Sequence, residues 1–237
     1  MFKCKQFTVK QGNCAMKVNT DSLILGSWAD VTDGARVLDI GTGTGVLALM
    51  MAQKTDTSAH INAIDIDTGA VEQAKENVHA SPWPHKVTVF HCDISKHISN
   101  GYDVIITNPP YFAEQNKRSA AYDAQSHTRK QARQFLSLSP EALFNAVAKN
   151  LSSTGRCYCL YPAVQENETR RIALAYGLHV QRILRVKHEA TVAPYVNAYC
   201  FASTSAIETE ETLIIRAEDG RYSAQYQRLC RAFYLNF

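Results

Sequence analysis

The sequence contains no apolar stretch long enough to cross a membrane. No run approaches the roughly 18 uncharged apolar residues that a transmembrane helix needs. Lys3 and Lys5 are not followed by an apolar segment, so we expect no secretory signal either. Hydrophobic residues make up 46% of the 237 residues and charged residues 20%. This composition is typical of a globular chain that can bury a sizeable core.

Cys-x-x-Cys pairs are also absent, and the seven cysteines are an odd number. A zinc site would need two such clusters, so we expect no bound metal. Cys157 and Cys159 are two residues apart in a predicted strand, which places both thiols on one face. The cysteines are therefore expected to be buried free thiols in a reduced, cytoplasmic protein.

A strong excess of one charge is missing too, because the net charge is only +3. The distribution of charge is more informative than the total. Residues 1–20 contain four lysines and no acidic residue, and residues 113–135 contain five basic residues against two acidic ones. These two stretches indicate either an anionic partner or ordinary solvated faces.

Strands and helices alternate through the middle of the chain, without repeats or low-complexity segments. This pattern predicts a doubly wound α/β fold with a mostly parallel, seven-stranded sheet and one antiparallel edge strand. We expect a single domain over residues 1–237, with an N-terminal lid or substrate segment at 1–30, a core at 31–205 and a strand–helix addition at 206–237. The predicted strands of the core are 36–40, 60–65, 87–91, 102–107, 155–161, 179–187 and 197–203.

A glycine-rich turn, Asp39-Ile40-Gly41-Thr42-Gly43-Thr44-Gly45, follows the first of these strands and opens a helix. Glycines allow a tight turn and let a ligand lie against the backbone. The helix N-terminus adds free N–H groups and partial positive charge. The carboxylate of Asp39 would repel a pyrophosphate but suits an ammonium group. The alternative is a purely structural turn.

Two further acidic residues end the next two strands. Asp65 could accept hydrogen bonds from both ribose hydroxyls, and Asp93 could accept one from an adenine amino group. In a parallel sheet these strand ends line one crevice. Each aspartate could instead be a turn former or a helix cap, the role that we expect for Asp67. Three acids at three successive strand ends favour a ligand site.

This order of motifs resembles the Rossmann-like class I methyltransferases over residues 31–203. The resemblance implies S-adenosylmethionine as cofactor, with its methionine moiety over the glycine turn, its ribose at Asp65 and its adenine at Asp93. The cofactor-binding residues expected from it are Asp39, Gly41, Gly43, Gly45, Asp65, Ile66, Asp93, Ile94 and Asn108.

The tetrapeptide Asn108-Pro109-Pro110-Tyr111 follows the fourth strand and should lie in the same crevice. A conjugated amine is a poor nucleophile because its lone pair is delocalised. The Asn108 side-chain oxygen and the Pro109 carbonyl could accept its two N–H bonds, and proline would hold both acceptors rigidly. Tyr111 offers a stacking face for a planar group. We therefore expect these four residues to be catalytic, although Pro-Pro alone could simply end a strand.

The tetrapeptide resembles the motif of adenine-N6, guanine-N2 and glutamine-N5 methyltransferases, so it indicates the reaction but not the substrate. The segments 7–11, 14–26, 81–83, 222–226 and 232–235 resemble a family of bacterial tRNA (adenine-N6)-methyltransferases that act on adenine 37 of a valine tRNA. That resemblance spans nearly the whole chain. It departs at Asp65, where the related sequences carry Glu.

The resemblance implies that the chain methylates the exocyclic N6 of an adenine in a tRNA anticodon loop. Alternatives are an rRNA guanine-N2 methyltransferase, a protein glutamine-N5 methyltransferase or a non-catalytic RNA-binding factor. We expect no obligate protein partner. Met16, Leu23 and Ile24 are expected to cover the cofactor, and Tyr226, Phe233 and Tyr234 to belong to the core. The expected RNA-binding residues are Lys17, Lys117, Arg118, Arg129, Lys130 and Arg133.

Overall fold

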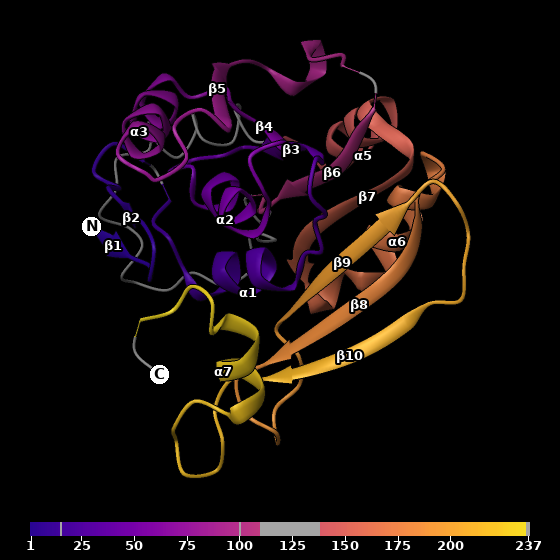
Figure 1. Cartoon of the computed structure of the whole chain (residues 1–237). Helices are drawn as coiled ribbons and strands as arrows, with labels where there is room; N and C mark the ends of the chain where they lie inside the picture. The colour runs from indigo at the N-terminus through magenta and orange to yellow at the C-terminus, as the bar shows by residue number, and fades with distance from the viewer. Residues whose placement is uncertain (15, 100, 110–137, 236–237) are drawn as a thin grey trace, which may run out of the picture.

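A computed structural model describes residues 1–14, 16–99, 101–109 and 138–235. Within them an eight-stranded sheet forms the centre of the molecule, with strand order β10-β8-β9-β7-β6-β3-β4-β5 (Figure 1). The strands are β3 (Arg36–Ile40), β4 (His60–Asp65), β5 (Val87–His91), β6 (Tyr102–Thr107), β7 (Leu151–Pro162), β8 (His179–Lys187), β9 (Val196–Ala202) and β10 (Thr209–Ile214).

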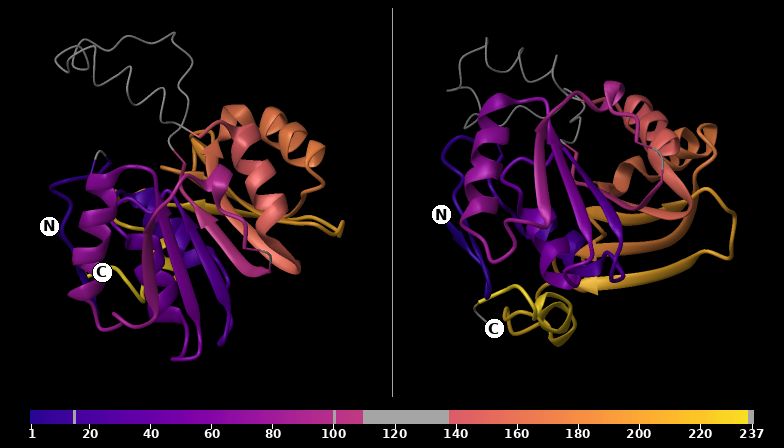
Figure 2. Two further views of the ribbon diagram at one scale, coloured as in Figure 1. Left: turned by 90° about the horizontal axis from the view of Figure 1, so that it is seen from above. Right: turned by 45° about the horizontal axis from the view of Figure 1, so that its top comes forward.

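Helices cover both faces of this sheet, as the doubly wound pattern predicts (Figures 1 and 2). One face carries α1 (Thr20–Trp28), α2 (Val46–Lys54) and α3 (Thr68–His79), and the other carries α5 (Pro140–Asn150) and α6 (Glu166–Ala175). Neighbouring residues of one strand join different cores: Val104 and Ile106 face α2, whereas Ile105 faces α5. The apolar runs of the central strands follow from burial on both sides.

Two details of the predicted sheet are wrong. Among the described residues the central sheet has eight strands instead of seven, and the antiparallel strand β9 lies between β7 and β8 instead of at an edge. The crossover through α6 makes β8 parallel to β7 but leaves a gap of one strand, and the β8–β9 hairpin fills it. All seven residues of β9 are buried, as an internal position requires. The edge strand on this side of the sheet is β10, which pairs in parallel with β8.

The prediction of free thiols is confirmed, and the prediction of burial holds for all but Cys14 and Cys92, which are partly buried. All seven are free, and five of them are buried. Cys157 and Cys159 belong to the same core, on the α5 face of the sheet. No group of three potential metal ligands occurs among the described residues. None of the described helices is long and apolar enough to span a membrane.

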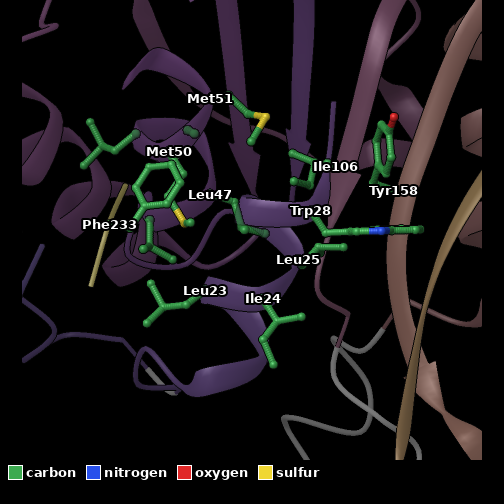
Figure 3. Close-up of a cluster of buried hydrophobic side chains, with 14 of the residues drawn as sticks. Leu23, Ile24, Leu25, Trp28, Leu47, Met50, Met51, Ile106, Tyr158 and Phe233 are labelled. Carbon is green, nitrogen blue, oxygen red and sulfur yellow. The ribbon is translucent and has the colours of Figure 1, made fainter. Parts of the chain in front are cut away.

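Helix α1 is part of the core rather than a cover for the cofactor. Leu23 and Ile24 are 1% and 0% exposed, and they pack with side chains of α2 such as Leu47 (Figure 3). The expectation of a lid is therefore wrong for these two residues, because α1 needs an apolar face to bury against α2. Met16 precedes the helix and is 50% exposed.

The two ends of the chain lie side by side (Figure 2). The short strands β1 (Phe2–Lys3) and β2 (Thr8–Val9) form a separate antiparallel pair, and the Lys5 amide donates to the Phe233 carbonyl over 2.9 Å. Helix α7 (Ala224–Cys230) has Ser223 as its N-cap, and the Ser223 hydroxyl accepts from the Tyr226 amide. Tyr226 and Phe233 are each 1% exposed, which confirms that they are core residues.

Candidate functional site

The carboxyl ends of four neighbouring parallel strands, β6, β3, β4 and β5, form one edge of the sheet. The register aligns Ile40 with both Thr107 and Ile64, and it aligns Asp65 with His91. The residues that follow these positions are therefore adjacent in space. The glycine turn, Asp65, Asp93 and Asn108 all lie along this edge, as the βα pattern predicts.

The glycine turn has a backbone that only glycine adopts readily. Gly41, Gly43 and Gly45 have φ angles of 67°, 55° and 82°, in the left-handed region. A Cβ atom added at Gly41 or Gly43 would meet nothing within 4 Å, so the surface of the turn opens onto unfilled space. Gly45 is the N-cap of α2 and supplies no side-chain cap. In the first turn of α2 the Ala48 amide donates instead to Asp39, over 3.1 Å.

Asp39 lies beneath the turn and not on its surface. It is 0% exposed, and its Oδ2 accepts from the Thr42 hydroxyl over 2.6 Å and from the Ala48 amide over 3.1 Å. Among the described residues its Oδ1 has no hydrogen-bond partner. Burial raises the pKa of the Asp39 carboxyl to about 7, against the lowering effect of these two bonds. The side chain thus ties the turn to α2, and it offers no exposed surface to an ammonium group.

Asp65 lies at the surface of the same crevice. Its Oδ2 accepts from the Gly43 amide over 2.9 Å, and its Oδ1 accepts from the Asp67 amide over 3.0 Å. Each carboxylate oxygen can accept a second hydrogen bond, so the group remains able to bind a diol. The neighbouring Ile66 is 40% exposed and gives an apolar surface beside it. Asp67 caps α3 through the Ala70 amide over 2.7 Å, which confirms its expected role.

Asp93 caps a short helix after β5 and stays partly exposed. Its Oδ1 accepts from the Ser95 amide over 2.9 Å and caps the short helix η1 (Ile94–Lys96). This backbone hydrogen bond, followed by one from the Ser95 side chain, lowers the pKa of the Asp93 carboxyl. The residue therefore stays ionised at neutral pH, and it is only partly buried. Ile94 is 6% exposed and belongs to the core on the α5 face.

Asn108 follows β6 and is held by the start of α1. Its Nδ2 donates to the Ser22 hydroxyl over 3.0 Å, and that hydroxyl lies 3.0 Å from the Asn19 side-chain oxygen. Pro109 is buried beside it. Pro110, Tyr111, Lys117, Arg118, Arg129, Lys130 and Arg133 lie outside the described residues. Lys17 is described and is exposed.

Contacts between distant parts of the chain supply site residues that sequence reasoning missed. Asn77 of α3 bonds to the Lys10 backbone through both ends of its amide and to the Thr44 carbonyl. It thereby holds the N-terminal segment beside the glycine turn. In the same segment, burial and then the negative charges of Asp65 and Asp67 raise the pKa of the Cys14 thiol to about 11. No local sequence motif predicts such contacts between residues that are distant in the sequence.

A second missed cluster lies beside the start of α1. The Tyr195 hydroxyl donates to Asp21 Oδ1 over 2.7 Å, and the exposed His188 ring stacks on Tyr195 at 4.0 Å between ring centroids. Burial raises the pKa of the Asp21 carboxyl. His188 and Tyr195 belong to the β8–β9 hairpin, so the cluster joins that hairpin to α1.

Comparisons with known proteins agree with this geometry. The family model described as the methyltransferase small domain matches residues 10–155. A tRNA1(Val) (adenine(37)-N6)-methyltransferase from Tolumonas auensis is 40% identical over 99% of this chain and 96% of its own length. The protein of the same name from Salmonella typhi is 38% identical over 99% of this chain and 94% of its own.

Solved structures share the fold at low sequence identity. A predicted O-methyltransferase from Agrobacterium tumefaciens has a TM-score of 0.66 at 14% identity, over 89% of this chain and 95% of that one. A putative RNA methyltransferase from Pyrococcus horikoshii has a TM-score of 0.57 at 20% identity, over 86% of this chain and 94% of that one.

Proposed function

This chain belongs to the tRNA1(Val) (adenine(37)-N6)-methyltransferase family, and on that premise we propose that it methylates the exocyclic N6 of adenine 37 in tRNA1(Val). The observation that carries the proposal is the similarity of 38–40% identity over nearly the full length of both chains. The match includes both ends of the chain, which lie outside the common methyltransferase core.

S-adenosylmethionine is the methyl donor, and it supplies an electrophilic methyl group on a sulfonium sulfur. The crevice fits it in three respects: an open glycine turn, a partly exposed Asp65 and an ionised Asp93. We assign the methionine moiety to the turn at Gly41–Gly45, the ribose to Asp65 and Ile66, and the adenine to Asp93 and Ile94. Asp39 is assigned a supporting role beneath the turn because it is fully buried.

The proposed work of Asn108 and Pro109 is to bind and orient the amine of the target base. The Asn108 Oδ1 and the Pro109 carbonyl accept the two N–H bonds, which turns the nitrogen lone pair toward the cofactor site. No base is required before transfer, because the methylated nitrogen can lose its proton to water afterwards. Catalysis then depends mainly on positioning. Asn108 also borders the cofactor site, and Pro110 and Tyr111 complete the motif in sequence.

RNA binding is assigned to the basic stretches. Lys17 is exposed where the N-terminal segment leads into α1. Lys117, Arg118, Arg129, Lys130 and Arg133 follow the catalytic tetrapeptide in sequence, and we expect them to bind tRNA phosphates without reading bases. An unpaired anticodon-loop base can be presented to the crevice without opening a duplex. Because the proposed substrate is a tRNA, we also propose a cytoplasmic location, and we propose that residues 1–237 act as one methyltransferase domain.

The test is methyl transfer by the purified protein to a tRNA1(Val) transcript, followed by nucleoside mass spectrometry. The proposal predicts N6-methyladenosine, and it predicts no product from a transcript with guanine at position 37. Methylation of guanine N2 in rRNA would identify the protein as a guanine methyltransferase. Methylation of a release factor would identify it as a glutamine-N5 methyltransferase, and binding of RNA without any transfer would leave only a binding role.

A further inference from the structure

Three polar side chains connect the start of α1 to the catalytic asparagine. Asn19 is the N-cap of α1, and its Oδ1 accepts from the Ser22 amide over 2.9 Å. The same oxygen lies 3.0 Å from Ser22 Oγ, and Ser22 Oγ lies 3.0 Å from Asn108 Nδ2. Ser22 is only 7% exposed. These three side chains form a hydrogen-bond relay from the helix cap Asn19 to Asn108, and its middle member, Ser22, has little access to water.

The direction of this relay follows from counting protons. A backbone N–H can donate only to an acceptor, so the Asn19 atom that faces the Ser22 amide is the carbonyl oxygen. The Ser22 hydroxyl has one proton, which it donates to that oxygen. Toward Asn108 the hydroxyl can then only accept, so the Asn108 atom that it meets is the nitrogen. The two ends of an amide have nearly the same shape, so only such a network distinguishes them.

We propose that Ser22 is a positioning residue that sets the polarity of the Asn108 amide, that is, which end of the amide, nitrogen or oxygen, faces the target. Asn19 in turn sets the direction of the Ser22 hydroxyl proton. The inference rests on the proposed function, in which Asn108 Oδ1 accepts from the target amine. With the nitrogen held toward Ser22, the oxygen lies at the other end of the amide. If the Asn108 amide were rotated by 180°, its N–H groups would face the N–H bonds of the target amine. Its oxygen would then face the oxygen of Ser22, and both hydrogen bonds would be lost. Ser22 acts through Asn108 and does not touch the reacting atoms.

Neutron diffraction from a deuterated crystal tests the relay without reference to activity. The expected map shows one deuteron on the Ser22 hydroxyl, directed at Asn19, and two deuterons on the Asn108 atom that faces Ser22. Deuterons on the opposite end of the Asn108 amide would overturn the proposal. If the expected polarity is seen in a protein that does not methylate adenine, the relay stands and the proposed function fails.

Single-turnover methylation of the tRNA1(Val) transcript tests what the relay does. Ser22→Ala removes the hydroxyl but keeps the backbone N–H that Asn19 caps, so the helix start is preserved. We expect the rate of transfer to fall about tenfold, with unchanged binding of S-adenosylhomocysteine and of tRNA. Ser27→Ala, the same substitution in the last turn of α1, is the matched control. A rate within about twofold of wild type for Ser22→Ala would contradict the proposal.

The Asn108→Asp variant separates polarity from simple packing. A carboxylate has oxygen at both ends, so its usefulness as an acceptor does not depend on which end faces Ser22. We therefore expect Ser22→Ala to cost much less in the Asn108→Asp background than in the wild type. Equal losses in the two backgrounds would mean that Ser22 only supports the local structure. Asn19→Asp keeps an acceptor at the cap and is expected to retain the wild-type rate within about twofold.

Discussion

At the scale of single residues, the proposed chemistry depends on Asn108. It lies directly after β6, is partly buried and donates to Ser22. Replacing it by alanine removes one of the two acceptors for the target amine. We expect Asn108→Ala to lower turnover by about a hundredfold, as the removal of a preorganised polar group from an active site does. Affinity for S-adenosylhomocysteine is expected to stay within about threefold.

The matched control for that substitution is Asn167→Ala, which removes an exposed asparagine side chain from α6. It should leave both turnover and cofactor affinity unchanged. Isothermal titration with S-adenosylhomocysteine and single-turnover kinetics measure the two quantities separately. Near-normal turnover of Asn108→Ala would exclude the role given to Asn108.

Asp39 gives a second prediction at this scale. Burial raises the pKa of its carboxyl from the ordinary 3.8 to about 7 in the folded protein. Between these values the folded state binds more protons than the unfolded state, so rising pH favours unfolding. This stabilising contribution is complete below the unfolded pKa and is lost as the pH rises through the folded pKa. The slope is at most about 1.4 kcal/mol per pH unit.

Asp39→Asn should remove this dependence while an amide oxygen still accepts from Thr42 and Ala48. Urea unfolding of both proteins at pH 4, 5, 6 and 7 measures the difference. The free energy of unfolding of the wild type is expected to fall relative to that of the variant as the pH rises. Parallel curves for the two proteins would show that Asp39 does not titrate in this range.

Sequence patterns located the strand-end residues well, because βα units bring the ends of parallel strands to one edge. The cap at Asp67 is a local contact and was also predictable. Two kinds of feature could not be predicted from the sequence. The burial of Asp39 depends on how the turn folds over it, and the contact between Asn108 and Ser22 joins positions separated by 86 residues.

At the scale of elements, the packing of β7 against β6 explains the glycine at position 155. A Cβ atom there would lie 2.6 Å from the Tyr102 carbonyl oxygen, which belongs to the backbone and cannot rotate away. The register of the two strands shifts between Tyr102 and Val104, next to this contact. We expect Gly155→Ala to lower the free energy of unfolding by about 1–3 kcal/mol, as overpacking does.

Gly12→Ala is the control for that substitution, because its Cβ atom would come no closer than 3.9 Å to Gln73. Its effect on stability should be small. Denaturant unfolding of the two variants gives the comparison, and equal stabilities would contradict the packing argument for Gly155.

The positions of β9 and α1 mark the limits of prediction at this scale. A run of alternating strands and helices predicts parallel neighbours, but it does not say where a final hairpin strand inserts. The place of β9 is decided by the gap that β8 leaves beside β7. The apolar residues of α1 likewise have no periodicity that separates a lid from a core helix, and contact with α2 decides between them.

At the scale of the whole molecule, charge should govern the binding of tRNA. Replacing Arg129 and Lys130 together by glutamates removes two positive charges that would pair with phosphates, if these residues bind RNA as we propose. We expect weaker tRNA binding and a smaller dependence of the affinity on salt, by about 0.7–0.9 for each phosphate that the variant no longer neutralises. Cofactor binding should not change.

The control is the double charge reversal of Lys149 and Arg156, two exposed basic residues away from the strand ends that form the crevice. Filter binding at several salt concentrations measures the affinity and its slope. An unchanged slope for the Arg129 and Lys130 pair would show that these two residues do not bind phosphates.

The most direct test of the central claim is nucleoside mass spectrometry of tRNA1(Val) from a strain that lacks this protein. Loss of N6-methyladenosine at position 37, its return on expression of the wild type and its continued absence with Asn108→Ala are the predicted results. An unchanged level of N6-methyladenosine in the strain without the protein would contradict the proposed function.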